Sequence, residues 1–227
     1  MAMSNSNDNS LIEQRRQYES GTLYRRELAA SPIKQFENWL GDARAAKLID
    51  ATSVAVTTVD TNHRPHTRMV LLKQFSDEGF IWFTDRSSDK GQQIDGNPSV
   101  CMLFFWRELE RQVRIEGRAY KVDDSLSDEY FYSRPEGSRF SAAASHQSQV
   151  VANRDVLQKQ VADLNEQYVD ADVPRPQRWG GYILKPDYFE FWQGRNDRLH
   201  DRFVYKTGSD AKPGDESVEW IINRLSP

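Results

Sequence analysis

The order of apolar and polar residues along the chain predicts mostly β-strands. Short segments rich in Val, Thr, Ile and aromatic residues are separated by polar turns, which is typical of hairpins in an antiparallel sheet. Residues 100–106 are almost wholly apolar, so we expect a strand buried on both faces, whereas residues 110–122 alternate regularly. About nine strands are expected, at residues 53–60, 66–75, 80–84, 100–106, 110–122, 179–184, 188–193, 199–205 and 217–223.

Helix signals are fewer. Ser31-Pro32 has the form of a helix start, and apolar residues recur behind it at helical spacing as far as Ala43. A capping box at residues 10–13 predicts a short helix that ends before Gly21, and further helices are expected at residues 85–97, 124–134 and 150–168. Around nine strands with three or four helices and no regular strand–helix alternation predict an α+β fold, in which an antiparallel barrel carries helices on its outside.

Length and composition narrow the class of protein. The chain has 227 residues, and we expect a flexible segment over residues 1–20 followed by a single domain over residues 21–227. No apolar run is long enough to cross a membrane, and the N-terminus does not have the form of a signal peptide. Cys101 is the only cysteine, which excludes an internal disulfide, suits the cytoplasm and predicts a small core residue. The net charge of −4 argues against nucleic-acid binding, so any anion site must be local.

Residues 188–202 hold the densest group of candidate site residues. Aromatic side chains run into a glycine turn, and Arg198, His200 and Arg202 follow at alternate positions. On a strand these three side chains would share one face, where they would repel each other unless an anion lay between them. The alternative is a solvated edge strand whose charges are balanced by the neighbouring aspartates. No nucleotide-binding glycine loop or zinc-protease motif occurs, and the four histidines lack metal-ligand spacing, so no metal site is expected.

This stretch resembles the pyridoxine (pyridoxamine) 5′-phosphate oxidases. Its Trp-Gln-Gly-x-x-x-Arg-Leu-His-Asp-Arg sequence is similar to the C-terminal motif of that family, and further similarity lies at residues 68–73, 110–112, 130–135 and 223–227. The resemblance implies a split-barrel homodimer that holds FMN at the subunit interface. It also implies oxidation of pyridoxine 5′-phosphate or pyridoxamine 5′-phosphate to pyridoxal 5′-phosphate, with dioxygen reoxidising the flavin and yielding hydrogen peroxide.

The resemblance also assigns residues to the two ligands. The expected FMN contacts are Arg68, Met69, Val70, Leu71, Leu72, Lys73, Phe83, Thr84, Lys90, Gln112, Gln147, Ser148, Trp192 and Arg202. The expected substrate contacts are Arg15, Arg16, Gln17, Tyr18, Lys73, Tyr130, Arg134, Ser138, Arg198, Leu199 and His200. Arg198 and His200 are expected at the reacting carbon, where a guanidinium can stack on the substrate ring and an imidazole can steer or accept a proton.

Two features complicate these assignments. Arg68 and Lys73 are five positions apart, so an ideal strand would point them to opposite faces, and either a bulge or two ligand regions must explain both roles. The other feature is Asp89, which stands where the family usually has an arginine that binds the FMN phosphate. We expect Asp89 to point into solvent at a helix start, and Arg86 to supply the missing cation.

Two other functions are compatible with the flavin residues. One is a split-barrel protein that binds FMN or pyridoxal phosphate without turnover. The other is an FMN-dependent reductase with a nicotinamide donor, which would keep the flavin contacts but not the substrate contacts. The complete set Tyr130, Arg134, Ser138, Arg198 and His200 favours the oxidase over both.

Overall fold

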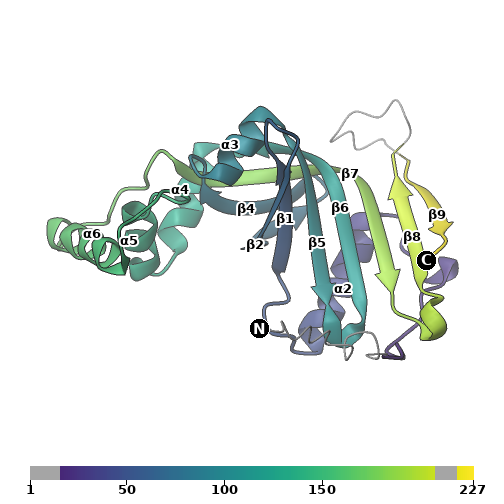
Figure 1. Ribbon diagram of the computed structural model, residues 1–227. Helices are drawn as coiled ribbons and strands as arrows, with labels where there is room; N and C mark the ends of the chain where they lie inside the picture. Colours follow the sequence, from purple (N-terminus) through teal and green to yellow (C-terminus); the bar gives the residue numbers. More distant parts are fainter. Residues whose placement is uncertain (1–15, 208–218) are drawn as a thin grey trace, which may run out of the picture.

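The computed structural model describes residues 16–207 and 219–227, and its centre is an antiparallel sheet (Figure 1). The strand order is β2-β1-β5-β6-β7-β4-β3, with β8 paired to β7 and β9 paired to β8. The strands are β1 Ser53–Val59, β2 Pro65–Leu71, β3 Gln74–Ser76, β4 Gly79–Asp85, β5 Ser99–Trp106, β6 Arg111–Lys121, β7 Trp179–Gln193, β8 Asp201–Lys206 and β9 Ile221–Leu225. The sheet curls into a half-barrel, which confirms the predicted antiparallel α+β fold.

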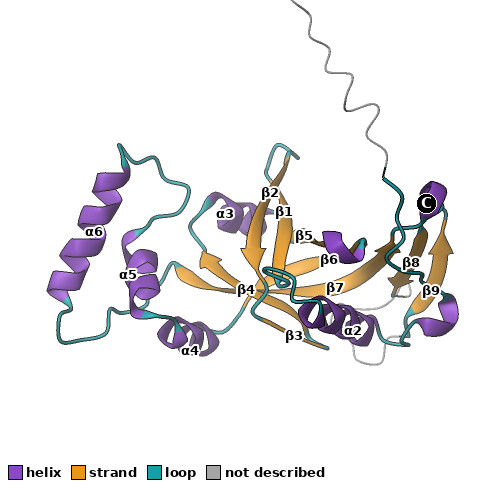
Figure 2. Ribbon diagram, turned by 90° about the horizontal axis from the view of Figure 1, so that it is seen from below, coloured by secondary structure: helices purple, strands orange, loops and turns teal. Residues whose placement is uncertain are grey.

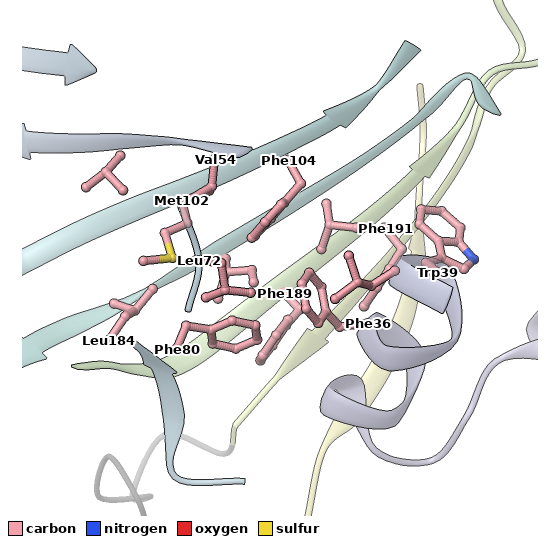
Figure 3. Close-up of a cluster of buried hydrophobic side chains, with 14 of the residues drawn as sticks. Phe36, Trp39, Val54, Leu72, Phe80, Met102, Phe104, Leu184, Phe189 and Phe191 are labelled. Carbon is pink, nitrogen blue, oxygen red and sulfur yellow. The ribbon is translucent and has the colours of Figure 1, made fainter. Parts of the chain in front are cut away.

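Five α-helices surround this sheet in the described parts of the chain, at α2 Pro32–Ala45, α3 Asp89–Gly96, α4 Asp124–Ser133, α5 Glu136–Ala144 and α6 Arg154–Gln167. Helix α2 begins as predicted, because the Ser31 side chain accepts a hydrogen bond from the Lys34 N–H and Pro32 occupies the first turn. Its apolar face is buried on the sheet, where the Phe36 ring lies 5.0 Å from the ring of Phe80 and 5.0 Å from that of Phe104 (Figure 3). Helices α4, α5 and α6 gather at one end of the molecule (Figures 1 and 2).

Strand β7 joins two segments that the sequence predicts as separate strands. Residues 179–184 pair with β4, residues 188–193 pair with β8, and β6 pairs along residues 182–193. Pro186 breaks the polar and apolar alternation without ending the strand, because the register shifts there by a bulge opposite Gly117. A Cβ at Gly117 would lie 2.1 Å from the Lys185 carbonyl oxygen, so only glycine allows this close approach.

Other strand predictions are corrected in detail. Strand β5 is not buried on both faces, because Val100, Met102, Phe104 and Trp106 face the core while Phe105 is 56% exposed on the other side. Cys101 lies on that second face and is half-buried, so it is not a core residue. The predicted strand over residues 66–75 is interrupted after Leu71, since Leu72 turns into the core.

The helix predictions are corrected at several places. Helix α5 was not predicted, and α6 begins at Arg154 rather than at Val150. Residues 16–19 are not helical, and the capping box at residues 10–13 lies outside the described residues. In the part of the chain that the structure describes, no helix is both long enough and apolar enough to cross a membrane.

The bulge gives a stability prediction. Replacing Gly117 with Ala should lower the free energy of unfolding by roughly 1–3 kcal/mol, because the new methyl group meets a backbone carbonyl that cannot easily move. Gly41→Ala is the matched control, since its Cβ meets nothing within 4 Å inside helix α2 and should raise stability by up to about 1 kcal/mol. Urea denaturation of both variants measures the difference, and equal stabilities would contradict this account of the bulge.

Candidate active site

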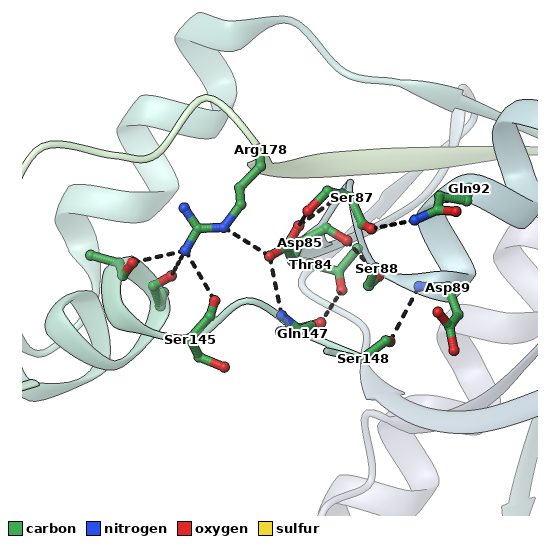
Figure 4. Close-up of polar contacts among 12 residues, drawn as sticks. Thr84, Asp85, Ser87, Ser88, Asp89, Gln92, Ser145, Gln147, Ser148 and Arg178 are labelled. Atoms are coloured by element: carbon green, nitrogen blue, oxygen red, sulfur yellow. Dashed lines mark hydrogen bonds and ion pairs between the residues drawn. The ribbon is translucent and has the colours of Figure 1, made fainter. Parts of the chain in front are cut away.

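One group of expected FMN contacts meets where β4 ends and α3 begins. The Lys90 cluster consists of Arg68, Thr84, Lys90 and Gln147. The Lys90 ammonium donates hydrogen bonds to Thr84 Oγ1 at 3.0 Å and to Gln147 Oε1 at 2.7 Å. The Thr84 hydroxyl donates to the same Gln147 oxygen at 3.0 Å (Figure 4). Burial lowers the pKa of Lys90, and the positive charge of Arg68 lowers it further. The positive charges of Lys90 and Arg68 repel each other, and a bound anion would offset this repulsion. The cluster is therefore a local site for an anion.

Arg68 is fixed within this cluster by its own contacts. Its guanidinium donates to Thr58 Oγ1 at 2.6 Å and to Gln93 Oε1 at 3.1 Å, and burial lowers its pKa. Its neighbours in β2 differ in exposure: Met69 and Leu71 are exposed, Val70 is half-buried, and Leu72 beyond the strand is in the core. Since β2 ends at Leu71, Arg68 lies on the strand and Lys73 lies in the link between β2 and β3, which resolves their apparent conflict in direction.

The expectation for Asp89 is only partly confirmed. Asp89 is the exposed first residue of α3, and its negative charge acts to raise the pKa of both Arg68 and Lys90. Arg86, however, does not replace a cation in the Lys90 cluster. Its guanidinium donates to the carbonyls of Val122 at 2.8 Å and Gly181 at 3.2 Å and pairs with Asp124, so it is held on the side of α4.

A second group, the Lys73 pocket, consists of Lys73, Phe83 and Tyr130. Arg134 lies beside this pocket, because its guanidinium is 4.9 Å from the Trp179 ring and that ring stacks on Phe83 at 5.6 Å. The rings of Phe83 and Tyr130 are stacked with centroids 4.1 Å apart, and Lys73 Nζ lies 5.9 Å from the Tyr130 centroid. A cavity of about 180 Å³ opens beside Lys73, Phe83 and Tyr130. Arg134 Nη1 is buried and finds no hydrogen-bond partner among the described residues, and burial lowers the pKa of this guanidinium. Ser138 lies nearby in the chain, in the first turn of α5.

A third group, the His200 cluster, forms at the other end of β7. The ring of His200 lies 4.6 Å from that of Trp192 and 5.3 Å from that of Tyr18. His200 Nδ1 accepts a hydrogen bond from the Arg195 N–H at 3.0 Å, so in the neutral ring Nε2 carries the hydrogen. Burial lowers the pKa of His200, and Arg198 lowers it further, which keeps the ring neutral at pH 7.

The prediction that Arg198, His200 and Arg202 share one strand face is wrong. Strand β8 begins at Asp201, and Arg198 lies in a short 3-10 turn with φ of +63°. Arg198 and His200 therefore come from an irregular turn, as does Leu199, which is 73% exposed. Arg202 is on the strand, where it pairs with Glu190 at 2.9 Å. Burial alone would raise the pKa of Glu190, but hydrogen bonds from Arg202 and Arg114 outweigh it and lower the pKa.

The segment before α2 covers the His200 cluster. We call residues 16–21 the N-terminal strap. Glu110 fixes it, since this buried carboxylate binds the Arg16 guanidinium at 2.5 Å and accepts the Ser20 N–H at 2.9 Å. The Gln17 side-chain oxygen accepts the N–H of Asp197 at 3.2 Å. Arg15, the remaining expected contact of this segment, lies outside the described residues.

The expected contacts thus divide into two separated halves. Trp192 pairs with Gln112 on β6 and with Arg202 on β8, so these three residues form one row beside His200. Phe83 pairs with Gly181, eleven residues before Trp192 on the same strand. Eleven residues of β-strand span about 36 Å, so the Lys90 cluster and Lys73 pocket lie far from the His200 cluster within one chain.

Sequence reasoning missed several residues that hold these groups in place. Asp85 and Arg178 support the loop that carries Gln147, and Glu110 and Glu190 support the His200 end. Glu110 lies within a motif of the resemblance but had no assigned role. Nothing in the sequence pattern marks Arg178.

Comparisons with known proteins identify the family of this chain. Residues 40–168 match the family described as pyridoxamine 5′-phosphate oxidase, and residues 179–227 match the pyridoxine 5′-phosphate oxidase C-terminal dimerisation region. The chain is 43% identical to the pyridoxine/pyridoxamine 5′-phosphate oxidase of Acaryochloris marina, over all of both chains. It is 47% identical to that of Bordetella pertussis, over 96% of this chain and 100% of the relative.

Solved structures show the same fold. PhzG from Burkholderia lata, in complex with tetrahydrophenazine-1-carboxylic acid, superposes with a TM-score of 0.82 at 28% identity, over 91% of this chain and 98% of PhzG. A pyridoxamine 5′-phosphate oxidase-related, FMN-binding protein from Nostoc punctiforme has the same fold, with a TM-score of 0.67 at 15% identity over 88% of this chain and all of that one. From the family matches and the full-length identities, the chain belongs to the pyridoxine/pyridoxamine 5′-phosphate oxidase family of enzymes.

Proposed function

We propose that this chain is an FMN-dependent oxidase that converts pyridoxine 5′-phosphate or pyridoxamine 5′-phosphate to pyridoxal 5′-phosphate. Two electrons leave the substrate carbon, dioxygen accepts them to give hydrogen peroxide, and the amine substrate also takes up water and releases ammonia. The observation that carries the proposal is the pair of cationic groups that meet at Phe83 and Thr84. Lys90 with Arg68 lies on the Thr84 side, and Lys73 with Arg134 lies on the Phe83 side.

The residues present fit two phosphorylated ligands. Bound FMN would supply the acceptor for a hydride. The Lys90 cluster offers ammonium, guanidinium, hydroxyl and amide groups for its phosphate, although Asp89 opposes part of that charge. The buried and unpartnered Arg134 Nη1 suits the substrate phosphate, because a buried donor without a partner gains most from an anionic acceptor.

Arg198 and His200 suit the substrate ring. Because neutral His200 accepts at Nδ1 and carries its hydrogen on Nε2, it can donate a hydrogen bond to the oxygen or nitrogen on the reacting carbon. This arrangement favours a role in positioning over a role as a base, since protonating Nδ1 would place its hydrogen against the Arg195 N–H. The cationic Arg198 favours negative charge that develops on the substrate oxygen.

A complete site requires two copies of the chain. The two halves lie about 36 Å apart along β7, farther than one flavin nucleotide can bridge. An apolar patch is available for a second copy, because Met69, Ala55 and Leu103 form one row across β2, β1 and β5 beside the exposed Phe105. We therefore infer a homodimer in which the Lys90 cluster and Lys73 pocket of one protomer face the His200 cluster of its partner.

Two other functions can be separated from this one. PhzG is bound to a ring acid without a phosphate, so this chain could oxidise such a compound instead. The Lys73 pocket favours a phosphate, because Arg134 adds a second cation to Lys73. A protein that binds flavin without turnover would fail the assay below.

The first test is spectroscopic and catalytic. The purified protein should bind FMN with a yellow absorbance band and should form pyridoxal 5′-phosphate and hydrogen peroxide in air from either phosphorylated substrate. Pyridoxine without phosphate is the matched control and should react far more slowly, because the Lys73 pocket loses its ligand. Flavin binding without product would support the non-catalytic alternative.

Shared sites predict complementation between inactive chains. Arg134→Ala and Arg198→Ala disable different halves, so each parent homodimer should have a low kcat/KM. A mixed dimer, isolated through two different tags, should regain one of its two sites and about half of the wild-type activity. No recovery in the mixed dimer would place both halves of a site in one chain.

The pKa of His200 tests whether the positive charge of Arg198 acts on the imidazole ring. Arg198→Gln should raise the pKa of His200 towards 6.5, because a positive charge that disfavours protonation is removed while burial remains. The pKa can be followed by NMR on the imidazole ring, with His200→Gln to assign the signal. Leu199→Ala changes an exposed neutral neighbour and should leave the pKa unchanged. A pKa that is unaltered in Arg198→Gln would show that this charge does not act on the ring.

A further inference from the structure

The loop that carries Gln147 and Ser148 has little apolar packing of its own. Ala144 is the last buried residue before it, Val150 beyond it is 99% exposed, and Ser148 has a left-handed backbone with φ of +69°. A polar and exposed loop does not hold one conformation through hydrophobic burial. Its position must therefore depend on specific hydrogen bonds.

Arg178 binds the end of helix α5 and the start of the loop from outside. Its Nη2 donates to the carbonyl oxygens of Ala143 at 2.8 Å and Ser145 at 3.0 Å (Figure 4). These carbonyls end helix α5, where no later turn of the helix can satisfy them. The side chain of Arg178 thus caps the helix and fixes the start of the loop.

Asp85 holds both Arg178 and the loop. One oxygen of this buried carboxylate accepts Arg178 Nε at 3.0 Å and the backbone N–H of Gln147 at 3.4 Å, and the other accepts the Ser87 N–H at 2.8 Å. Asp85 and Arg178 are themselves placed by the sheet, since Asp85 pairs with Trp179 and the Arg86 N–H donates to the Arg178 carbonyl at 2.6 Å. The sheet is in this way connected to the loop through the Asp85–Arg178 ion pair, in addition to the direct hydrogen bonds that Gln147 makes with Asp85 and Thr84.

The loop in turn completes the Lys90 cluster. Gln147 Oε1 receives hydrogen bonds from both Lys90 and Thr84, and Ser148 Oγ accepts the N–H of Asp89 at 3.2 Å. Displacement of the loop would leave the Lys90 ammonium without its nearest acceptor. Neither Asp85 nor Arg178 has to touch a ligand to have this effect.

We propose that Asp85 and Arg178 are positioning residues for the cofactor phosphate, acting through Gln147 and Ser148. The proposal rests on the proposed function, because the Lys90 cluster has a phosphate to bind only if FMN is the cofactor. Charge-assisted hydrogen bonds of this kind, when lost, correspond to about a tenfold change in affinity.

The test compares two flavins that differ only in the phosphate. Protein is titrated into FMN and into riboflavin, and the dissociation constants are read from flavin fluorescence. Arg178→Gln should weaken FMN binding by about tenfold and leave riboflavin binding unchanged. The dissociation constant of riboflavin divided by that of FMN should therefore fall by about tenfold. A general loss of structure would weaken both flavins alike, and that result would overturn the proposal.

Two further variants keep the test decisive. Arg175→Gln is the matched control, because Arg175 lies with Arg178 in the segment between α6 and β7. Arg175 pairs with Asp128 of α4 at 2.6 Å, away from the Gln147 loop. Its ratio should equal that of the wild type. Asp85→Asn serves where Arg178→Gln does not fold, since the amide keeps an acceptor for Ser87 but removes the charge opposite Arg178. An unchanged ratio in Asp85→Asn also overturns the proposal, whereas a wild-type protein that binds no FMN contradicts the proposed function itself.

Discussion

Continuous pairing between β6 and β7 is the interaction on which both ends of the candidate site depend. Strand β7 carries Trp179 beside the Lys73 pocket and Trp192 beside His200, and β6 accompanies it along nearly its whole length. The bulge at Gly117 lets the pair bend without losing its register on either side. One strand therefore fixes the distance between the Lys73 pocket and the His200 cluster.

Three carboxylates with little solvent exposure hold the Gln147 loop, the N-terminal strap and Arg202 to this framework. Asp85 holds the Gln147 loop, Glu110 holds the N-terminal strap, and Glu190 holds Arg202. Each accepts hydrogen bonds from at least one arginine, because a buried carboxylate without a partner would be costly. These three carboxylates therefore fix the positions of their arginine partners without having to contact a ligand.

The sequence was sufficient for the general fold and for most strands, because alternation reports which face of a strand is buried. It could not show that residues 179–193 form one strand, since Pro186 reads as a break and the bulge that accommodates it depends on Gly117 far away in the chain. It also could not show the left-handed backbone at Arg198, which removes that residue from the expected strand face. Local patterns carry no information on such tertiary constraints.

For the site, the family resemblance named residues but not their grouping. Arg68 and Lys73 share one motif, yet Arg68 lies on β2 and Lys73 lies beyond the end of that strand. Arg86 lies three residues from Asp89, yet it is held by carbonyls on the side of α4. The role of Arg178 arises only from the meeting of helix α5 with the end of β4. The positions of these residues depend on contacts between segments that are far apart in the sequence, so they can be read only from the structure.

The N-terminal strap covers the His200 cluster through few contacts. Tyr18 lies against both His200 and Trp192, so its ring occupies the space beside them while the strap is in place. The strap is tied mainly by one carboxylate and one aromatic ring, whereas the sheet beneath it is paired on both sides. Local opening of these few contacts costs much less than any distortion of the sheet. Loss of the Glu110 ion pair would therefore release the segment over His200 while the sheet keeps its pairing.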